Sequence, residues 1–269
     1  MRTLYDYEVF QALTRTLMLG RVSLSPESED LTTLLGRHPR LVVALNHGPM
    51  LGPLAGLVAM SDLFCRHGGA DRRPFGITWR QFYRIPVARQ IFSYLTQVDH
   101  AIDFNEALQL LRSGEATDCV IMPEGQNCNF GDNRHIQPFL SPRFLELAIR
   151  AQVPVLIGVH HGSQAWERVV TVNDRVLAAL GWLPDSMRHR LQESRQLSLP
   201  ALPRPLDEVR MTFRLYRPRL TERKLSHDKA VRSRQLWQEA LEVRSLMEDM
   251  LQALARPEAS RMTEQEARA

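Results

Sequence analysis

The sequence has no apolar run that is long enough to cross a bilayer. Its longest apolar stretch, at 41–60, is interrupted by Asn46, His47, Pro49 and Pro53, whereas a transmembrane helix needs about 20 apolar residues in a row. The first ten residues, MRTLYDYEVF, carry acidic side chains where an export signal has its apolar core. We therefore expect a cytoplasmic chain that contacts a membrane only from the surface.

Cysteine and lysine are both scarce. Cys65, Cys119 and Cys128 are odd in number and lack the spacing of a metal site, which argues against a disulfide framework and indicates a reducing compartment. Lysine occurs only at Lys224 and Lys229, so arginine carries most of the positive charge, and the net charge is +4. The arginines are scattered and not clustered with aromatic residues, and no glycine-rich phosphate loop occurs. We therefore expect no nucleic-acid partner.

What remains is the composition of a globular protein. The chain has 269 residues, of which 44% are hydrophobic and 24% charged, enough for one sizeable core. We predict a single domain over residues 1–256, and a polar, disordered tail at 257–269.

Short apolar runs alternate with helical patterns in the first part of the chain. The runs are nearly all apolar and bounded by turn residues, which is typical of strands buried on both faces. The alternation predicts an α/β fold with a mostly parallel central sheet flanked by helices. The predicted strands are 41–45, 119–122 and 153–159, and the predicted helices are 86–95, 103–113 and 144–151.

The N-terminal segment 1–25 contains an amphipathic helix over residues 4–18. Helical spacing places Tyr5, Val9, Leu13 and Leu17 on one face. This face either packs on the protein's own core or lies on a lipid surface, and the sequence leaves both interpretations open.

The C-terminal half is predicted to end in a long helix over 226–255. Its apolar stripe is typical of a core contact, with a dimer contact as the alternative. Before it, residues 174–195 predict two helices broken at Pro184, and 200–205 predicts a proline-rich linker within the domain. The strict alternation at 209–215 predicts a half-exposed strand at or near a sheet edge.

Three polar loops follow the predicted strands. They carry His47, the pair Glu124–Gly125, and the pair His160–His161. The loops that leave the carboxyl ends of parallel strands line the ligand crevice of such a sheet. The sequence therefore predicts a site where these loops converge, with one of the two histidines of the third loop pointing inward and the other outward.

The order of motifs over the core segment 41–160 resembles that of the PlsC-like glycerolipid and lysophospholipid acyltransferases. Asn46-His47 stands at the position of the family's N-H-x-x-x-x-D motif. The stretch ITWRQFYRIPVARQIFSYLTQVDHAIDF resembles its second block, VIMPEGQN its F-P-E-G-T-R block, and VPVLIGV its "VPVVPV" strand. The resemblance implies a PlsC-type fold and an O-acyltransferase of phospholipid biosynthesis.

The resemblance also implies roles for individual residues. His47 would be the general base that activates the acceptor hydroxyl, and imidazole suits this role because much of it is neutral at pH 7. Glu124, Gly125, Arg80 and His100 would bind the lipid acceptor. Acyl-CoA or acyl-carrier protein would be the co-substrate, and neither a further cofactor nor a metal is implied.

The chain departs from the family pattern at several positions. The aspartate that orients the family's histidine is replaced by Gly52, and Asp62, Asp99 and Asp103 are candidates to substitute for it. The second block has His100 where the family has arginine. The third block has Gln126-Asn127-Cys128 where the family has Thr-Arg-Ser. Phosphate-binding arginines are thus missing, which favours an acceptor without a phosphomonoester, although Arg80, Arg84 and Arg134 are candidates to replace them.

Other constellations and functions remain as alternatives. A thiol nucleophile formed by Cys128 with Asp132 and His135 is disfavoured because the loop between them gives no fixed geometry. A metal site that joins Cys65-Arg66-His67 to His160–His161 lacks a common spacing. The alternative functions are a non-catalytic relative that binds lipid or a protein partner, and an acyl-thioester hydrolase that uses water and the same His47.

Overall fold

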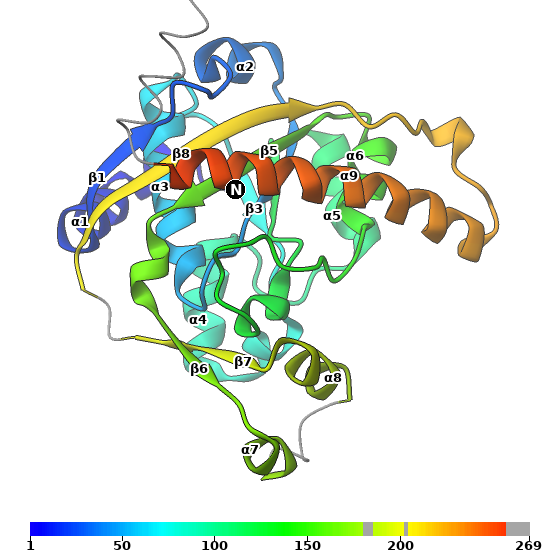
Figure 1. The fold of residues 1–269 in the computed structure, drawn as a ribbon. Helices are drawn as coiled ribbons and strands as arrows, with labels where there is room; N and C mark the ends of the chain where they lie inside the picture. The colour runs from blue at the N-terminus through cyan, green and yellow to red at the C-terminus, as the bar shows by residue number, and fades with distance from the viewer. Residues whose placement is uncertain (180–184, 202–203, 257–269) are drawn as a thin grey trace, which may run out of the picture.

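The computed structural model describes residues 1–179, 185–201 and 204–256 (Figure 1). The predicted disordered tail at 257–269 and the predicted helix break at Pro184 lie outside these residues. The boundaries of the single domain stay a prediction.

The central element is a six-stranded sheet. Every neighbouring pair of its strands is parallel except β8 and β5, which are antiparallel. The prediction of a mostly parallel sheet is therefore confirmed. In spatial order, the strands are β1 (Leu19–Leu24), β8 (Leu206–Tyr216), β5 (Val155–His161), β2 (Leu41–Leu45), β4 (Asp118–Ile121) and β3 (Pro74–Gly76).

The strand directions bring several chain segments to one edge of the sheet. Strands β5, β2, β4 and β3 are parallel, so the loops that follow them meet at their common carboxyl edge. Because β1 and β8 run in the opposite direction, β1 begins at this same edge. The helix before β1 is thus connected directly to the edge where the predicted site residues lie.

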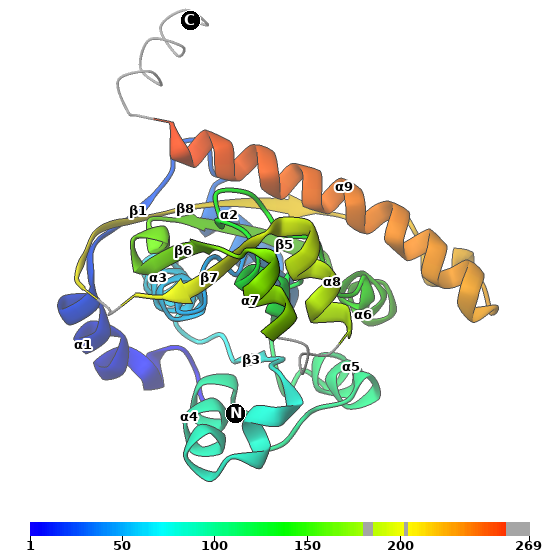
Figure 2. The same cartoon turned by 60° about the horizontal axis from the view of Figure 1, so that its bottom comes forward.

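Helices cover both faces of the sheet, and the strands alternate between the two cores. Val42 and Ala44 of β2 point to one core, whereas Val43 and Leu45 point to the other. The first core includes α5 (Phe104–Ser113), α6 (Arg143–Ala151) and α9 (Lys229–Ala255), and the second includes α2 (Leu31–Arg37) and α3 (Gly52–Arg66). Figure 2 shows α9 lying along the sheet on the side opposite α3.

The long C-terminal helix is confirmed in position and in orientation. α9 extends over 27 residues and crosses the face of the sheet formed by β5 and β8 (Figure 1). Its predicted apolar stripe is buried in the protein's own core. The stripe residues are Leu236, Ala240, Val243, Met247, Met250 and Leu254.

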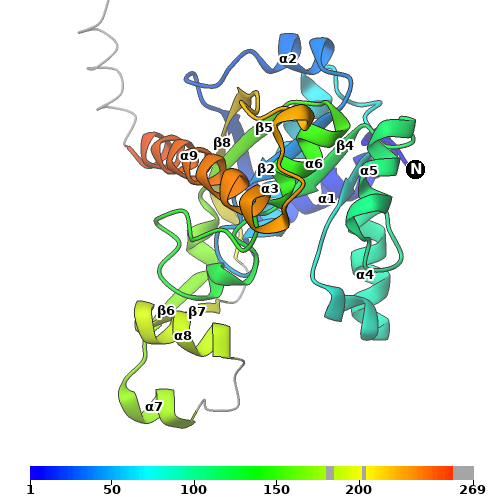
Figure 3. The same cartoon turned by 90° about the vertical axis from the view of Figure 1, so that its right-hand side faces the viewer.

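A smaller two-stranded sheet lies beside the main one. It pairs β6 (Glu167–Thr171) with β7 (Gln196–Pro200), and it is accompanied by α7 (Asp174–Ala179) and α8 (Asp185–Ser194). Figure 3 shows this unit projecting from the main sheet. The two predicted helices are present, but the predicted linker begins with Pro200, which is the last residue of a strand. The turn η4 (Ser163–Trp166) connects β5 to this unit.

The N-terminal helix is confirmed, but the interpretation that its apolar face packs on the core is wrong. Residues Tyr5–Tyr7 form the turn η1 and Glu8–Met18 form α1. The side chains predicted on one face are between 58% and 83% exposed, whereas Gln11 and Thr14 point inward and are each 8% exposed. The outward residues are Tyr5, Val9, Leu13 and Leu17.

A third group of helical segments lies between β3 and α5. It consists of the turn η2 (Arg80–Arg84) and helix α4 (Pro86–Thr96). The remaining turns are η3 (Gly125–Asn129) and η5 (Glu222–Lys224).

Within the described ranges, no helix combines the length and the apolar character needed to cross a membrane.

Candidate active site

Asn46 fixes the loop that follows β2 to the end of β5. Its side-chain nitrogen donates to the carbonyl oxygen of His160 at 3.1 Å, and its side-chain oxygen accepts from the backbone N–H of His160 at 2.7 Å. Asn46 is 1% exposed, so these hydrogen bonds are shielded from water and hold the loop firmly. The next residue, His47, therefore has a defined position at the carboxyl edge of the sheet.

Each ring nitrogen of His47 has a polar group beside it. Nδ1 lies 3.2 Å from the carbonyl oxygen of Gly48, and Nε2 lies 3.7 Å from Sγ of Cys128. A carbonyl oxygen only accepts hydrogen bonds, so it fixes the proton on Nδ1 and leaves Nε2 as the basic nitrogen. Burial lowers the pKa of His47 below its ordinary value of 6.5. The ring is consequently neutral at pH 7, with Nε2 facing the thiol of Cys128.

Glu124 connects the histidine loop to a second loop. Its carboxylate accepts the backbone N–H of His47 at 2.7 Å and the backbone N–H of Gln137 at 2.6 Å. The residue is 1% exposed, and burial raises the pKa of its carboxyl group to about 7. Both oxygens are thus engaged in holding the backbone in place. The predicted contact between Glu124 and an acceptor stays a prediction.

Two glycines at the site cannot be replaced without strain. Gly125 has φ of +49°, and a Cβ atom there would overlap the side chain of Leu140. Gly48 has φ of +64°, and a Cβ atom there would lie 2.9 Å from Oγ of Ser163. Because positive φ is costly for residues with a side chain, glycine lets both loops adopt their turns. The close neighbour of Gly125 is a leucine of the protein itself, and a role in acceptor binding remains a prediction.

The position of the missing aspartate has no room for a side chain. Gly52 begins α3, and a Cβ atom there would overlap the carbonyl oxygen of His47. The backbone at this position therefore accommodates glycine but no residue with a Cβ atom, unless the loop shifts. The carbonyl oxygen of Gly48 occupies the place at Nδ1 where an orienting carboxylate would act.

The three candidate substitutes for this aspartate bind elsewhere. Asp62 forms salt bridges with Arg15 and Arg66, and Asp103 accepts the backbone N–H of Glu106 as the N-cap of α5. The third candidate, Asp99, binds His100, as described next.

His100 and Arg80 are both exposed. The ring of His100 lies between two carboxylates, with Nδ1 2.7 Å from Asp99 and Nε2 2.9 Å from Glu106. These hydrogen bonds raise the pKa of His100. Arg80 begins η2, in the segment that follows β3. Their binding of an acceptor stays a prediction, and for His100 a phosphate would have to compete with two carboxylates.

The paired histidines at the end of β5 point in opposite directions, as expected. His160 is fully buried, its Nε2 lies 2.9 Å from Oγ of Ser163, and burial lowers its pKa to about 3. His161 is only partly buried. Among the described residues, no three His, Cys, Asp or Glu side chains are grouped as metal ligands would be.

The pairing of Cys128 with His47 was missed at the level of the sequence. The histidine considered there, His135, instead binds Glu248 at 2.7 Å. No local pattern could have found it, because Cys128 and His47 are 81 residues apart in the sequence. Burial raises the pKa of the Cys128 thiol well above its ordinary value, so the sulfur is a neutral thiol and not a thiolate.

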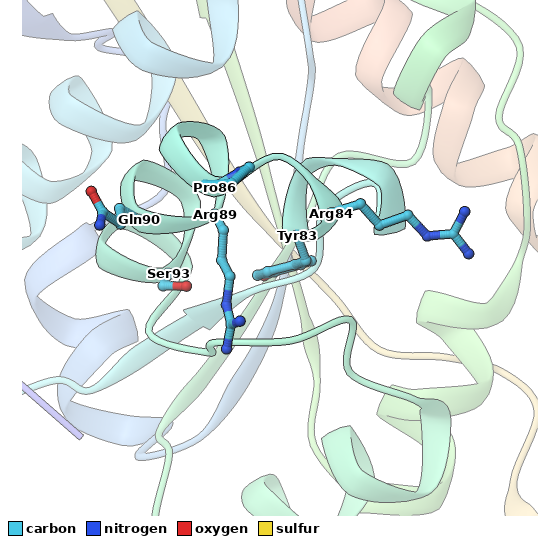
Figure 4. A pocket seen from close by; sticks show the side chains of 6 residues that line it. All are labelled: Tyr83, Arg84, Pro86, Arg89, Gln90 and Ser93. Atoms are coloured by element: carbon cyan, nitrogen blue, oxygen red, sulfur yellow. The ribbon is translucent and has the colours of Figure 1, made fainter.

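A pocket of about 640 Å³ lies on η2 and α4 (Figure 4), and His47 is not among its lining residues. The side chain of Arg84 points away from that of Arg89, and the ring of Tyr83 lies between their stems. The lining residues are Tyr83, Arg84, Pro86, Arg89, Gln90 and Ser93.

No model of a protein family matches the chain, and no curated protein matches it. Among solved structures, the chain is similar to the crystal structure of PlsC, the 1-acyl-sn-glycerophosphate acyltransferase from Thermotoga maritima. The two chains are 13% identical, the match covers 91% of this chain and 79% of the other, and the TM-score is 0.44.

Proposed function

We propose that the protein is an acyltransferase that moves a fatty acyl group from an acyl thioester to the hydroxyl of a lipid acceptor. Two lines of support converge on this proposal. The order of motifs over 41–160 resembles that of glycerolipid acyltransferases, and the geometry gives the motif histidine a basic nitrogen. The observation that carries most weight is the position of His47 between Gly48 and Cys128.

The proposed reaction needs one proton carrier. Nε2 of His47 takes the proton of the acceptor hydroxyl while the hydroxyl oxygen attacks the thioester carbonyl carbon. The carbon–sulfur bond of the tetrahedral intermediate then breaks, and the leaving thiolate receives the proton from the imidazolium. An ester and a free thiol result, so atoms and charges balance. The thiol belongs to CoA or to acyl-carrier protein in this proposal.

The hydrogen bond from His47 to Gly48 supports this role despite the missing carboxylate. In the serine proteases, replacing the orienting aspartate by asparagine lowers kcat about 10⁴-fold, because the imidazole then adopts the wrong tautomer. In the present site a carbonyl oxygen selects the productive tautomer. This carbonyl oxygen does not carry the full negative charge with which a carboxylate would stabilise the imidazolium. We therefore propose an active site whose base is correctly oriented but less strongly assisted than one with a carboxylate.

The two backbone hydrogen bonds that Glu124 accepts support the same mechanism. Glu124 holds the backbone N–H of His47 at 2.7 Å and thereby fixes the loop relative to η3, where Cys128 lies. The neutral thiol of Cys128 faces Nε2 at 3.7 Å, a long and weak hydrogen bond. An acceptor hydroxyl is the stronger donor, so it displaces the thiol from Nε2 at little cost.

The remaining parts of the proposal concern the partners. The acceptor is a lipid, the donor is acyl-CoA or acyl-carrier protein, and the protein acts in phospholipid biosynthesis at the cytoplasmic face of a membrane. The exposed apolar side of α1 supports the membrane contact. Arg80, His100, Glu124 and Gly125 are the proposed acceptor-binding residues.

The test follows the release of free thiol from acyl-CoA, with and without a lipid extract as acceptor. We expect release that depends on the lipid, and loss of it in His47→Gln by about 10²- to 10⁴-fold. The matched control is His227→Gln, which changes an exposed histidine of another segment. Release without lipid would instead identify the hydrolase. Absence of release with CoA and carrier-protein donors of several chain lengths would identify the non-catalytic binding protein.

A further inference from the structure

His160 is a buried titratable residue that the proposed reaction does not use. It lies near the end of β5 and is fully buried. Nε2 of its ring lies 2.9 Å from Oγ of Ser163, and Nδ1 has no hydrogen-bond partner among the described residues. A buried polar atom without a partner is costly, so an apolar side chain would fill this place more favourably. The histidine therefore calls for a reason other than packing.

The ring of His160 carries its proton on Nε2. Burial lowers the pKa of His160 to about 3, so the ring is neutral at pH 7 and has one N–H group. A proton on Nδ1 would be a buried donor without an acceptor, which is rare in folded proteins. A proton on Nε2 instead donates to Oγ of Ser163, which is itself fully buried. We call these two residues the His160–Ser163 pair.

The backbone of His160 holds the start of the loop that carries the candidate base. The side chain of Asn46 accepts from the N–H of His160 at 2.7 Å and donates to its carbonyl oxygen at 3.1 Å. Asn46 directly precedes His47 in the chain. The first residue of the loop is therefore fixed relative to β5.

The side chains of the His160–Ser163 pair reach the same loop two residues later. A Cβ atom at Gly48 would lie 2.9 Å from Oγ of Ser163 and 3.2 Å from Nε2 of His160. The pair thus packs directly against the α-carbon of Gly48. A glycine with φ of +64° has wide conformational freedom, and the pair fills the space beside it. The backbone of Gly48 is restrained as a result.

A second glycine also makes room for the ring of His160. Gly56 lies within α3, and a Cβ atom there would be 2.9 Å from Nδ1 and 3.1 Å from Cε1 of this ring. Glycine inside a helix is less favourable than alanine, so its presence in α3 is explained by the close approach of the ring. The ring occupies a space that two glycines leave open, one in the loop and one in α3.

The carbonyl group of Gly48 matters for the candidate base. Its oxygen lies 3.2 Å from Nδ1 of His47, which keeps the proton on Nδ1 and leaves Nε2 basic. A rotation of Gly48 would remove this acceptor, and His47 would no longer be restricted to one tautomer. The residue that sets the tautomer is thus the one that the His160–Ser163 pair restrains.

We propose that His160 and Ser163 are positioning residues for the base of the acyl transfer. Their hydrogen-bonded pair keeps Gly48 in the conformation that places its carbonyl oxygen at Nδ1 of His47. In this role neither residue touches a substrate, because both act through Gly48. The catalytic part of the role rests on the proposed function, whereas the effect on the tautomer of His47 does not.

The experiment measures the nitrogen chemical shifts of the histidine rings by NMR in the full-length protein, since these shifts distinguish a protonated from a bare ring nitrogen. The signals of His47 are identified by their loss in His47→Gln. Wild type should carry the proton of His47 on Nδ1. Ser163→Ala and His160→Leu should each show a mixture of both tautomers, and kcat for thiol release should fall about tenfold or more. In His160→Gln the amide nitrogen can still donate to Ser163, so this variant should stay near wild type.

A double variant separates positioning from packing. His160→Leu/Ser163→Ala replaces both polar partners by apolar groups, so its thermal transition should return toward that of wild type. The mixed tautomers and the low kcat should persist, because Oγ, the atom of the pair that lies nearest to Gly48, is missing. A pair that only fills the core would instead give wild-type behaviour in all three measurements.

Tyr216→Phe is the matched control. It removes a hydrogen bond to Glu239 of 2.9 Å near the other end of β5, where Tyr216 lies beside Val155. The thermal transition should fall, and the signals of His47 should stay as in wild type.

Four results would overturn the proposal. They are a wild-type His47 without its proton on Nδ1, an unchanged tautomer in Ser163→Ala, a wild-type double variant, and an equal tautomer change in Tyr216→Phe. Ser163→Ala removes a single oxygen atom, so it remains decisive if His160→Leu does not fold. A changed tautomer with an unchanged kcat would exclude the catalytic part of the role. Because the NMR measurement requires no turnover, failure of the proposed acyl transfer leaves the tautomer test intact.

Discussion

Nδ1 of His47 lies 3.2 Å from the carbonyl oxygen of Gly48, the next residue in the chain. The Nδ1 side of the imidazole is thus held by the backbone of its own loop. The backbone position depends on glycine at 48, where φ is +64°. The group that faces Nδ1 is therefore fixed in position but uncharged.

Restoring the motif aspartate should impair the protein. In Gly52→Asp, the new Cβ overlaps the carbonyl oxygen of His47, and such overpacking costs roughly 1–3 kcal/mol of stability. The favourable effect of an acidic residue at a helix N-terminus, about 0.3–1 kcal/mol, is smaller. We expect a lower free energy of unfolding in urea and a lower kcat. Gly36→Asp is the control, since nothing lies within 4 Å of a Cβ there. A gain in kcat in Gly52→Asp would contradict this view of the loop.

The pH dependence should reflect the neutral state of His47. Burial lowers the pKa of its ring below 6.5, and only the neutral ring accepts a proton. The midpoint of the acidic decline of kcat/KM should therefore lie below pH 6.5. A pH profile of thiol release measures this. A decline centred above 6.5 would mean that the ring gains its proton more readily than its buried position implies.

Glu124 should link stability to pH. Because burial raises its pKa from 4.5 to about 7, the folded protein binds this proton more tightly than the unfolded chain. The stabilisation is fully present below pH 4.5 and is lost as the pH rises through about 7. The contribution is about 3 kcal/mol at most.

Glu124→Gln should remove this dependence. The amide nitrogen of glutamine cannot accept a backbone N–H, so one of the two hydrogen bonds is lost at a cost of about 1–3 kcal/mol. Urea unfolding at pH 5 and pH 8 should show a smaller pH difference in the variant than in wild type. Equal pH differences in both proteins would exclude Glu124 as the linked group.

Cys128 offers a test between base catalysis and a covalent thiol mechanism. If His47 acts on the acceptor hydroxyl, Cys128→Ala leaves Nε2 free and keeps the activity. Cys128→Ser places a stronger hydrogen-bond donor at Nε2 and lowers the activity. A nucleophilic thiol would give the opposite order, with Cys128→Ala inactive and a detectable acyl adduct on the wild-type enzyme. Initial rates and intact mass after mixing with acyl-CoA distinguish the two.

The parallel part of the fold was predictable because its strands carry strong local signals. The runs that became β2, β4 and β5 are nearly all apolar, since both of their faces are covered. Strand β1 was not predicted, because LGRVSL continues directly from α1 and its apolar residues, Leu19, Val22 and Leu24, do not alternate strictly. Its pairing with β8 arises from residues far away in the sequence, which a local pattern does not contain.

The site was predictable in part for a similar reason. Side-chain types identified His47 and Glu124, but the carbonyl oxygen that orients the ring has no signature in the sequence. Periodicity also revealed an apolar side on α1 without telling whether the fold covers it. That depends on where Gln11 and Thr14 find contacts, and only the packed structure decides this.

The pairing of β1 with β8 has a consequence for the order of folding. Leu19 lies beside Leu206 in the sheet, so β1 gains this partner strand only after β8 has been synthesised. Contacts across such a separation form late, because closing a long loop costs entropy before any contact compensates it. During synthesis β1 therefore stays without a partner strand, held only by the packing of α1 and β1 against α3, until β8 completes the sheet.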